Sequence, residues 1–212
     1  MVLPRTAPLW FRTEPSAETI RTFLAGQEAL PWSYAEVGAT KAGAPAGFLE
    51  DHHRVRLGGG ENGFVAAVAA VRRWTMFPRA WTRIFPGEAA VREDQVVGML
   101  AHALGGWWLN ACRIVYVIDE AGPVRRFGFA YGTLPGHVEQ GEERFCVEWL
   151  ADDSVWYDLR AFSRPRYWPA RLGYPLTRRL QRRFARDSLA QMCAAVAAAV
   201  AADRRSGGES PS

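Results

Sequence analysis

The sequence predicts an α+β domain in which one long C-terminal helix covers a curved antiparallel sheet of about six to seven strands. Between residues 80 and 162 apolar residues alternate with a period of two, which is typical of strands with one buried face. The connections between these segments are short, so consecutive strands are expected to pair antiparallel. From residue 168 to residue 202 the apolar spacing is helical. An added helix is predicted near the N-terminus.

The first part of the chain is expected to place several elements ahead of the main sheet. Residues 13–30 are predicted to form a short helix, with Pro15 in its first turn and Ser16 as a candidate cap. The later elements are an extended segment at Trp32–Val37, a loop at Gly38–Gly47, a strand at His53–Leu57 and a helix at Glu61–Trp74.

The main sheet is predicted from six consecutive segments that share the period of two. They are Trp81–Phe85, Gln95–Leu104, Trp107–Ile118, Arg125–Leu134, Glu142–Leu150 and Ser154–Phe162. Their short connections predict an antiparallel meander, because parallel strands need a longer crossover.

The register of the last hairpin can be tested from the sequence alone. Phe145, Val147 and Trp149 share one face of the first strand, and Val155, Tyr157 and Leu159 share one face of the second. The two apolar sets meet only if an odd number of residues separates the strands, and Ala151–Asp153 provides three. Glu148, Asp158 and Arg160 then lie on the outer face, where charge pairs across strands are expected rather than catalysis.

Two other strands supply candidate ligand contacts. Phe129, Tyr131 and Thr133 share a face that is expected to point inward. The opposite face carries Gly128, Ala130 and Gly132, which permit close approach of another element, for which the N-terminal helix is the candidate. In the strand Trp107–Ile118, Asn110 and Tyr116 are the polar members of one otherwise apolar face.

The C-terminal helix is expected to begin near Pro175 and to bury Leu176, Leu180 and Phe184. The tail is polar and rich in glycine and serine, which predicts disorder. The predicted organisation is an N-terminal helical extension packed on the domain (residues 1–32), one domain (33–202) and a disordered tail (203–212).

Composition and motifs argue against several classes of site and location. Three cysteines without a CxxC pair argue against a disulfide framework or a thiolate metal site, and free thiols are expected instead. Asp51, His52 and His53 do not form a metal site, because adjacent strand residues point to opposite faces. No signal peptide is recognised and no apolar run reaches the ~20 residues of a membrane span, so a cytoplasmic location is expected. No cofactor is predicted.

Several motifs resemble the domain-of-unknown-function family numbered nineteen-ninety. They are Tyr34–Thr40 (YAEVGAT), Leu109–Arg113 (LNACR), Arg126–His137 (RFGFAYGTLPGH), Gly141–Phe145 (GEERF), Val155–Asp158 (VWYD) and Arg178–Phe184 (RRLQRRF). The resemblance runs from about Tyr34 to Met192 and implies a START-like helix-grip fold, the group that includes polyketide cyclases and lipid-transfer domains. It implies no catalytic residue.

Three functions are open, and the first is binding of a hydrophobic or amphipathic small molecule between the sheet and the C-terminal helix. The predicted ligand contacts are Asn110, Tyr116, Phe129, Tyr131, Thr133, His137, Phe145, Trp149, Leu180 and Phe184. The alternative for these aromatic residues is that they fill a solid core. The second function is a cyclase or lyase that uses the same pocket, with His137 as the candidate acid or base.

The third function is an interaction surface formed by arginines. Eight arginines carry +8 with no acid between them, in a chain whose net charge is +4: Arg164, Arg166, Arg171, Arg178, Arg179, Arg182, Arg183 and Arg186. A solvated helix face is the usual meaning of such a pattern. Contact with an anionic membrane ranks behind that interpretation, and nucleic acid is not favoured because exposed aromatic residues are not interleaved with the charge. The oligomeric state is left open.

Overall fold

The computed structural model describes residues 7–166 and 174–207. Its elements, in chain order, are β1 (Leu9–Phe11), α1 (Ala17–Ala25), the short helix η1 (Ala39–Lys41), β2 (Leu49–Gly59), α2 (Gly60–Arg72), β3 (Thr82–Phe85), β4 (Val96–Ala103), β5 (Gly106–Glu120), β6 (Arg125–Thr133), β7 (Glu139–Trp149), β8 (Ser154–Pro165) and α4 (Tyr174–Gly207). Every predicted strand from Trp81 onward is present, and β1 is an addition.

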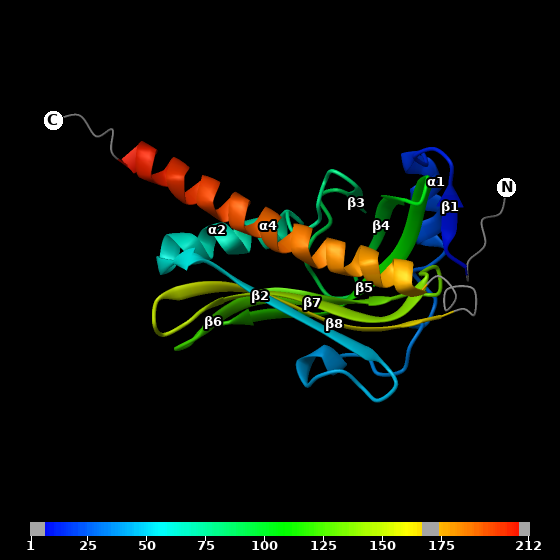
Figure 1. Cartoon of the computed structure of the whole chain (residues 1–212), viewed down its shortest axis with the longest axis horizontal. Helices are drawn as coiled ribbons and strands as arrows, with labels where there is room; N and C mark the ends of the chain where they lie inside the picture. The colour runs from blue at the N-terminus through cyan, green and yellow to red at the C-terminus, as the bar shows by residue number, and fades with distance from the viewer. Residues whose placement is uncertain (1–6, 167–173, 208–212) are drawn as a thin grey trace.

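The strands form one curved antiparallel sheet with the order β2-β8-β7-β6-β5-β4-β3. The short strand β1 pairs with the beginning of β5, which makes the sheet eight-stranded. Helices α2 and α4 lie across one face, while the segment that contains η1 lies on the other (Figure 1). These features confirm the predicted α+β helix-grip class.

The hairpin of β7 and β8 has the predicted register. Phe145 pairs with Leu159, Val147 with Tyr157, and Trp149 with Val155. The side chains of these strands therefore alternate as the sequence indicates, with the apolar set facing the helices and the charged set facing away.

Strand β5 contains an irregularity that the sequence analysis did not predict. Ile114 pairs with Tyr131, and the next paired residue, Tyr116, faces Ala130. Val115 is the extra residue of a β-bulge, and a bulge reverses the faces of all residues beyond it. Asn110 therefore lies on the inner face, whereas Tyr116 lies on the outer face. The prediction that these two residues share a face is wrong for this reason.

Residues 34–42 form a segment that we call the strap, and it lies on the outer face of the sheet (Figure 1). The predicted extended segment Trp32–Val37 forms no strand. One side chain of β7 binds the strap. The Glu142 carboxylate accepts hydrogen bonds from the amides of Gly38 (2.7 Å) and Thr40 (3.1 Å) and from the Tyr34 hydroxyl (2.8 Å).

The element that approaches the small residues of β6 is the strap, not the N-terminal helix. A Cβ at Gly132 would collide with the Tyr34 hydroxyl. Helix α1 packs instead against β4, and it buries Ile20, Phe23 and Leu24 in a small cluster with Leu100 and other residues. Ser16 caps α1 as predicted, since its hydroxyl accepts a hydrogen bond from the Thr19 amide at 3.2 Å.

Helix α4 begins at Tyr174 and continues to Gly207, beyond the predicted end at Ala202. Residues 203–207 of the expected tail are therefore helical, and the remainder lies outside the described residues. The second part of α4 buries Met192 and Val196 beside α2, in the main core of the protein. Within the described residues no helix is long and apolar enough to cross a membrane.

Candidate functional site

A cavity of about 650 Å³ lies between the first half of α4 and the inner face of the sheet. Its walls come from β2 to β8 and from residues 176–185 of α4. The apolar part of the wall includes Trp81, Met99, Trp108, Leu159, Leu180 and Phe184. The polar part includes Asp51, His53, Asn110, Tyr131, Thr133, His137, Glu139, Glu143 and Gln181. The cavity is thus amphipathic and has the size of a small-molecule site.

Glu143 is one of two carboxyl groups on the wall that are contributed by β7. It pairs with Tyr131 across the strands, and both side chains point inward. The Tyr131 hydroxyl donates a hydrogen bond to Glu143 Oε2 at 2.7 Å. Burial raises the pKa of Glu143 to about 7, against the opposing effect of this hydrogen bond, and the nearby carboxyls of Asp51 and Glu139 raise it further.

Glu139 is the second carboxyl group, four residues earlier on the same face of β7. Its side chain is buried, with 8% exposed. Its Oε2 accepts a hydrogen bond from Gln181 Nε2 at 2.5 Å, whereas the buried Oε1 has no donor among the described residues. Burial raises the pKa of Glu139 to about 7.

Gln181 belongs to a chain of hydrogen bonds that joins α4 to β2. Arg178 donates to Gln181 Oε1 at 2.7 Å and to Asp51 Oδ1 at 2.6 Å, with a second bond to Asp51 Oδ2. An arginine that binds a carboxylate through two nitrogens is held in a fixed orientation. The chain therefore positions Gln181, and through it Glu139, at the polar end of the cavity.

His137 lines the cavity at the turn between β6 and β7. Its Nδ1 accepts a hydrogen bond from the Glu139 amide at 3.0 Å, which leaves the ring proton on Nε2. Burial lowers the pKa of His137 to about 4. The ring is therefore neutral near pH 7. It can donate a hydrogen bond through Nε2, but Glu139 and Glu143 have pKa values better suited to proton transfer at that pH.

Asn110 and Thr133 both line the cavity. Asn110 Oδ1 accepts from the Val138 amide at 3.3 Å. Thr133 Oγ1 accepts from the Gly141 amide at 3.0 Å and lies 2.6 Å from the Ser33 hydroxyl. Their polar atoms are thus partly satisfied by the loops on either side. Leu180 and Phe184 complete the predicted contacts that lie in the wall.

Four of the predicted ligand contacts do not line the cavity. Phe129 and Phe145 are fully buried and pack on Phe77, Trp74 and each other in a solid aromatic core. Trp149 stacks on Phe64 of α2 with ring centroids 6.0 Å apart. Tyr116 is on the outer face, where its hydroxyl lies 2.7 Å from Thr40 Oγ1 of the strap. The core interpretation is therefore correct for the first three residues.

The sequence analysis missed Asp51, His53, Glu139, Glu143 and Gln181 as cavity residues. The sequence does contain a signal for Glu139 and Glu143. The inward face of Phe145, Val147 and Trp149, extended backward by steps of two, passes through Glu143 and Glu139. Charged residues on an inward face are a strong indication of a functional site, because burial of an unpaired charge is costly.

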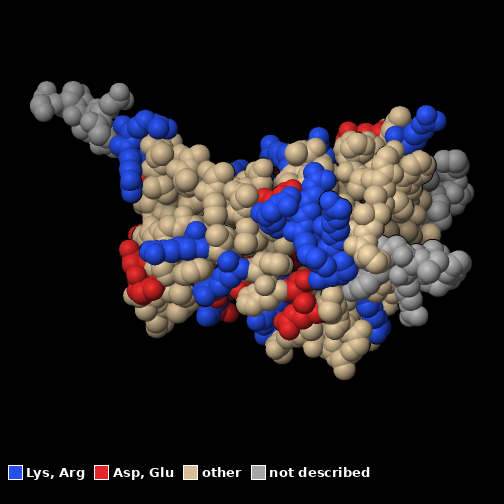
Figure 2. Space-filling view, viewed as in Figure 1, with Lys and Arg blue, Asp and Glu red and all other residues tan. Residues whose placement is uncertain are grey.

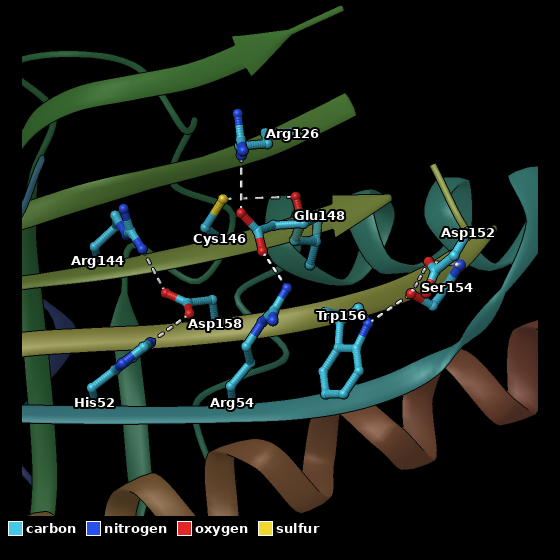
Figure 3. A network of polar contacts seen from close by, with 11 residues as sticks. His52, Arg54, Arg126, Arg144, Cys146, Glu148, Asp152, Ser154, Trp156 and Asp158 are labelled. Atoms are coloured by element: carbon cyan, nitrogen blue, oxygen red, sulfur yellow. Dashed lines mark hydrogen bonds and ion pairs between the residues drawn. The ribbon is translucent and has the colours of Figure 1, made fainter. Parts of the chain in front are cut away.

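The charged residues of the outer face form a separate network (Figure 3). Asp158 accepts bonds from His52 and Arg144, each at 2.6 Å. Glu148 is bonded by Arg54 at 2.7 Å and by Arg126 at 2.9 Å. Burial opposes ionisation of Asp158, but the bonds from His52 and Arg144 lower its pKa. Each carboxylate is paired across strands, which is the structural role predicted for this face.

Arginine side chains gather over the first half of α4 on the face seen in Figure 2. The exposed arginines of this group are Arg179, Arg182, Arg183 and Arg186. Arg183 and Arg186 pair with Asp187, at 3.5 Å and 2.8 Å. Arg178 differs from the prediction, since it turns toward Asp51 and supports the cavity. Arg171 lies outside the described residues.

Metal ligation has no geometric basis in the residues that the structure describes. No group of three or more His, Cys, Asp or Glu side chains there is arranged to hold an ion. His52 and His53 point to opposite faces of β2, as predicted, and only His53 lines the cavity.

Comparison with known proteins identifies relatives across most of the chain. The family described as Domain of unknown function (DUF1990) matches residues 33–191. A UPF0548 protein of Dictyostelium discoideum is 40% identical over 159 residues, which cover 70% of this chain and 73% of that protein. A UPF0548 protein of Deinococcus radiodurans is 38% identical over 184 residues, which cover 81% and 91%.

Two solved structures overlap with this one at low sequence identity. A hypothetical protein of Helicobacter pylori, jhp0584, has a TM-score of 0.47 and 12% identity, and covers 78% of this chain and 95% of its own. Ara h 8.0201 has a TM-score of 0.44 and 14% identity, and covers 72% and 99%.

The family match spans β2 to most of α4, and therefore includes the strands and the helix that enclose the cavity. The names of the relatives describe no activity, so function has to come from the geometry of the cavity. The family itself is settled by the extent of the match and by the identity to the relatives: the chain belongs to the DUF1990 family of UPF0548 proteins.

Proposed function

We propose that the protein binds an amphipathic small molecule in the cavity between α4 and the sheet. The observation that carries this proposal is the cavity itself, about 650 Å³ with an apolar wall and a polar end. A concave space of this size, with an apolar wall and a few convergent polar groups, is typical of small-molecule sites. A cytoplasmic location, expected from the sequence, is part of the proposal.

The distribution of apolar and polar residues over the wall supports a ligand with an apolar body and one polar group. Apolar and small side chains of β3 and β4 line one part, including Met99 and Ala101, while the carboxyls of Glu139 and Glu143 lie at another. A ligand placed along the cavity would bury its apolar body and bring its polar group to the carboxyls. Burial of the apolar body would contribute about 25 cal/mol for each Å² removed from water.

The test is to fill the cavity and to measure binding. Ala101→Phe places a large side chain in the apolar wall, and Ala190→Phe adds the same ring on the exposed side of α4 as a control. Native mass spectra are recorded for the wild type and both variants after incubation with a library of lipids and aromatic compounds. The expected result is bound species with the wild type and Ala190→Phe, and none with a folded Ala101→Phe. Absence of any bound species with the wild type would contradict the proposal.

A second candidate function is acid–base catalysis on a bound substrate, of the cyclase or lyase type. The specific observation in its favour is that burial raises the pKa values of Glu139 and Glu143 to about 7 within one cavity. Such groups exchange protons readily near neutral pH. The test is to follow any ligand found by native mass spectrometry for a change of mass over time. Turnover that disappears in Glu143→Gln but not in Glu148→Gln would favour this function.

A further inference from the structure

The polar end of the cavity contains more carboxyl groups than cations. Asp51, Glu139 and Glu143 line it, and Arg178 is the guanidinium that contacts one of them. Both terminal nitrogens of Arg178 are bound to Asp51. That arginine therefore compensates the charge of Asp51 first, and its hydrogen-bonded link to Glu139 runs through Gln181. Its charge lowers the pKa of Glu139, but less than burial raises it.

One carboxyl oxygen of Glu139 lacks a hydrogen-bond donor among the described residues, which suggests that a ligand supplies one. Its Oε1 is buried without a donor among the described residues, while its side chain is 8% exposed and forms part of the cavity wall. A buried oxygen without a hydrogen bond costs about 1–3 kcal/mol, and more when it is charged. A donor carried by a ligand would remove this cost.

Glu143 is a second buried carboxyl group at this end of the cavity whose charge is not compensated by a bonded cation among the described residues. Among the described residues its hydrogen-bond partner is the neutral Tyr131 hydroxyl, and the groups that shift its pKa include two other carboxyls and no cation. Without a ligand, the raised pKa values keep protons on Glu139 and Glu143 near neutral pH. A cation at this position can replace those protons.

We infer that the ligand of the cavity carries an amine, which is protonated in the complex and donates a hydrogen bond to Glu139 Oε1, with Glu143 as a second carboxylate nearby. This inference rests on the proposed ligand-binding function and assigns the chemical class of the ligand. A ligand carboxylate would meet three carboxyls and be repelled. A neutral alcohol would satisfy Oε1 but leave the charge uncompensated.

The probes are decylamine, decanol and decanoate, which share one chain and differ only in the head group. Their dissociation constants are measured by titration calorimetry with the wild type at pH 8, below the concentration at which the amphiphiles aggregate. The amine is expected to bind about tenfold or more tightly than the alcohol, since a hydrogen bond to a charged group contributes about 1.5–3 kcal/mol. Decanoate is expected to bind most weakly.

Two matched variants of β7 test whether Glu139 causes the preference for the amine. Glu139→Gln removes the charge in the cavity, and Glu148→Gln removes a charge from the outer face of the same strand. Glu139→Gln should weaken decylamine binding about tenfold and change decanol binding by less than about twofold. Glu148→Gln should change neither, and Ala101→Phe should abolish both.

The pH dependence gives an independent readout. The titratable and charged side chains that face this end are Asp51, His53, Tyr131, His137, Glu143 and Arg178. Since Glu139 must lose its proton to hold the cation, decylamine affinity is expected to fall about tenfold from pH 8 to pH 6. Decanol affinity should change far less over this range.

The outcomes separate the two proposals. If none of the three probes binds, the ligand-binding function fails and the amine assignment fails with it. If decanol or decanoate binds as tightly as decylamine, the cavity function stands and the amine assignment is wrong. Decylamine binding that is unaffected by Glu139→Gln also overturns the assignment. Preference for the amine that disappears in Glu139→Gln and persists in Glu148→Gln supports it.

Discussion

At the scale of single residues, strand β7 places carboxyl groups on both faces of the sheet with opposite electrostatic consequences. On the outer face Glu148 is bonded by Arg54 and Arg126. On the inner face Glu139 and Glu143 have no such partners, and burial raises their pKa values to about 7. The inner pair therefore costs stability when it is ionised, which is a property expected of groups retained for binding or chemistry.

The Glu139→Gln variant should be more stable than the wild type at pH 8 and equally stable near pH 4. The folded-state pKa of Glu139, about 7, is above its ordinary value of 4.5. The folded protein therefore holds an extra proton between these values, and stability falls as pH rises through this window. The gain at pH 8 should be on the order of 2 kcal/mol. Urea unfolding at both pH values measures it.

The control for this experiment is Glu148→Gln, which removes a paired carboxylate from the same strand. It should not stabilise the protein at pH 8. His137 titrates with the opposite sign, since burial lowers its pKa to about 4 and its contribution rises with pH. Comparison of each variant with the wild type at the same pH cancels that contribution. A Glu139→Gln protein less stable than the wild type at pH 8 would contradict the prediction.

At the scale of elements, one side chain accepts several of the hydrogen bonds that hold the strap to the sheet. Glu142 accepts hydrogen bonds from the Gly38 and Thr40 amides, from the Thr40 hydroxyl and from the Tyr34 hydroxyl. It neighbours Glu143 in the chain, so adjacent residues of β7 serve the strap on one face and the cavity on the other. Four hydrogen bonds of the strap therefore converge on one carboxylate, beside the contact between Thr40 and Tyr116.

Glu142→Ala should release the strap while the sheet remains folded. Removing the carboxylate leaves buried amides without acceptors, at a cost on the order of 3 kcal/mol in unfolding free energy. Hydrogen exchange should accelerate at the amides of Gly38 and Thr40, and remain slow in the middle of β7. The variant Glu143→Ala serves as the control, because Glu143 makes no contact with the strap amides. Unchanged protection at Gly38 in Glu142→Ala would disprove this role.

The bulge in β5 is a second feature at this scale. Val115 is the unpaired residue, and it allows Asn110 to face the cavity while Tyr116 faces the strap. Deleting Val115 would reverse one end of β5, so that either the Tyr116 end or the Asn110 end presents the wrong face. The variant is expected to lose the cooperative thermal unfolding transition seen by circular dichroism. Deleting Ala121, at the turn before β6, should be tolerated better.

At the scale of the whole molecule, the inner face of the sheet is divided into a solid part and a hollow part. Helix α2 and the second part of α4 cover the solid part, where Phe129, Phe145 and Phe77 pack together. The first half of α4 spans the hollow part, where Leu180 and Phe184 line the cavity. The packed core and the proposed binding cavity thus lie at different parts of one sheet.

This division predicts unequal costs for two large-to-small substitutions. Phe129→Ala, in the solid part, should lower the free energy of unfolding by about 3–5 kcal/mol. Leu180→Ala, in the cavity wall, should cost about 1 kcal/mol, because its side chain is only partly buried and faces an existing space. Urea denaturation of both variants measures the difference. Equal losses would show that the cavity wall is packed as tightly as the core.

Much of the fold follows from local patterns in the sequence. The period of two in each strand, the odd spacing in the β7–β8 turn and the helical spacing after residue 174 are enough to predict the elements, the register and the class. These features depend on residues close together in the chain. The same patterns place Asn110, Tyr131, Thr133, Leu180 and Phe184 on the correct faces, and the structure finds these five in the cavity wall, together with His137 of the turn before β7.

The sequence by itself therefore determined which side of each strand faces inward, up to the bulge at Val115. Only the tertiary structure decided which part of the inward side is filled. That choice depends on where α2 and α4 cross the sheet, because Trp74 covers Phe129 and Phe77 covers Phe145, while Tyr131 borders the cavity. The polar end also required the structure, since it joins groups from β2, β7 and α4 that are far apart in the chain. Alternation is a local property, whereas a cavity depends on distances between elements.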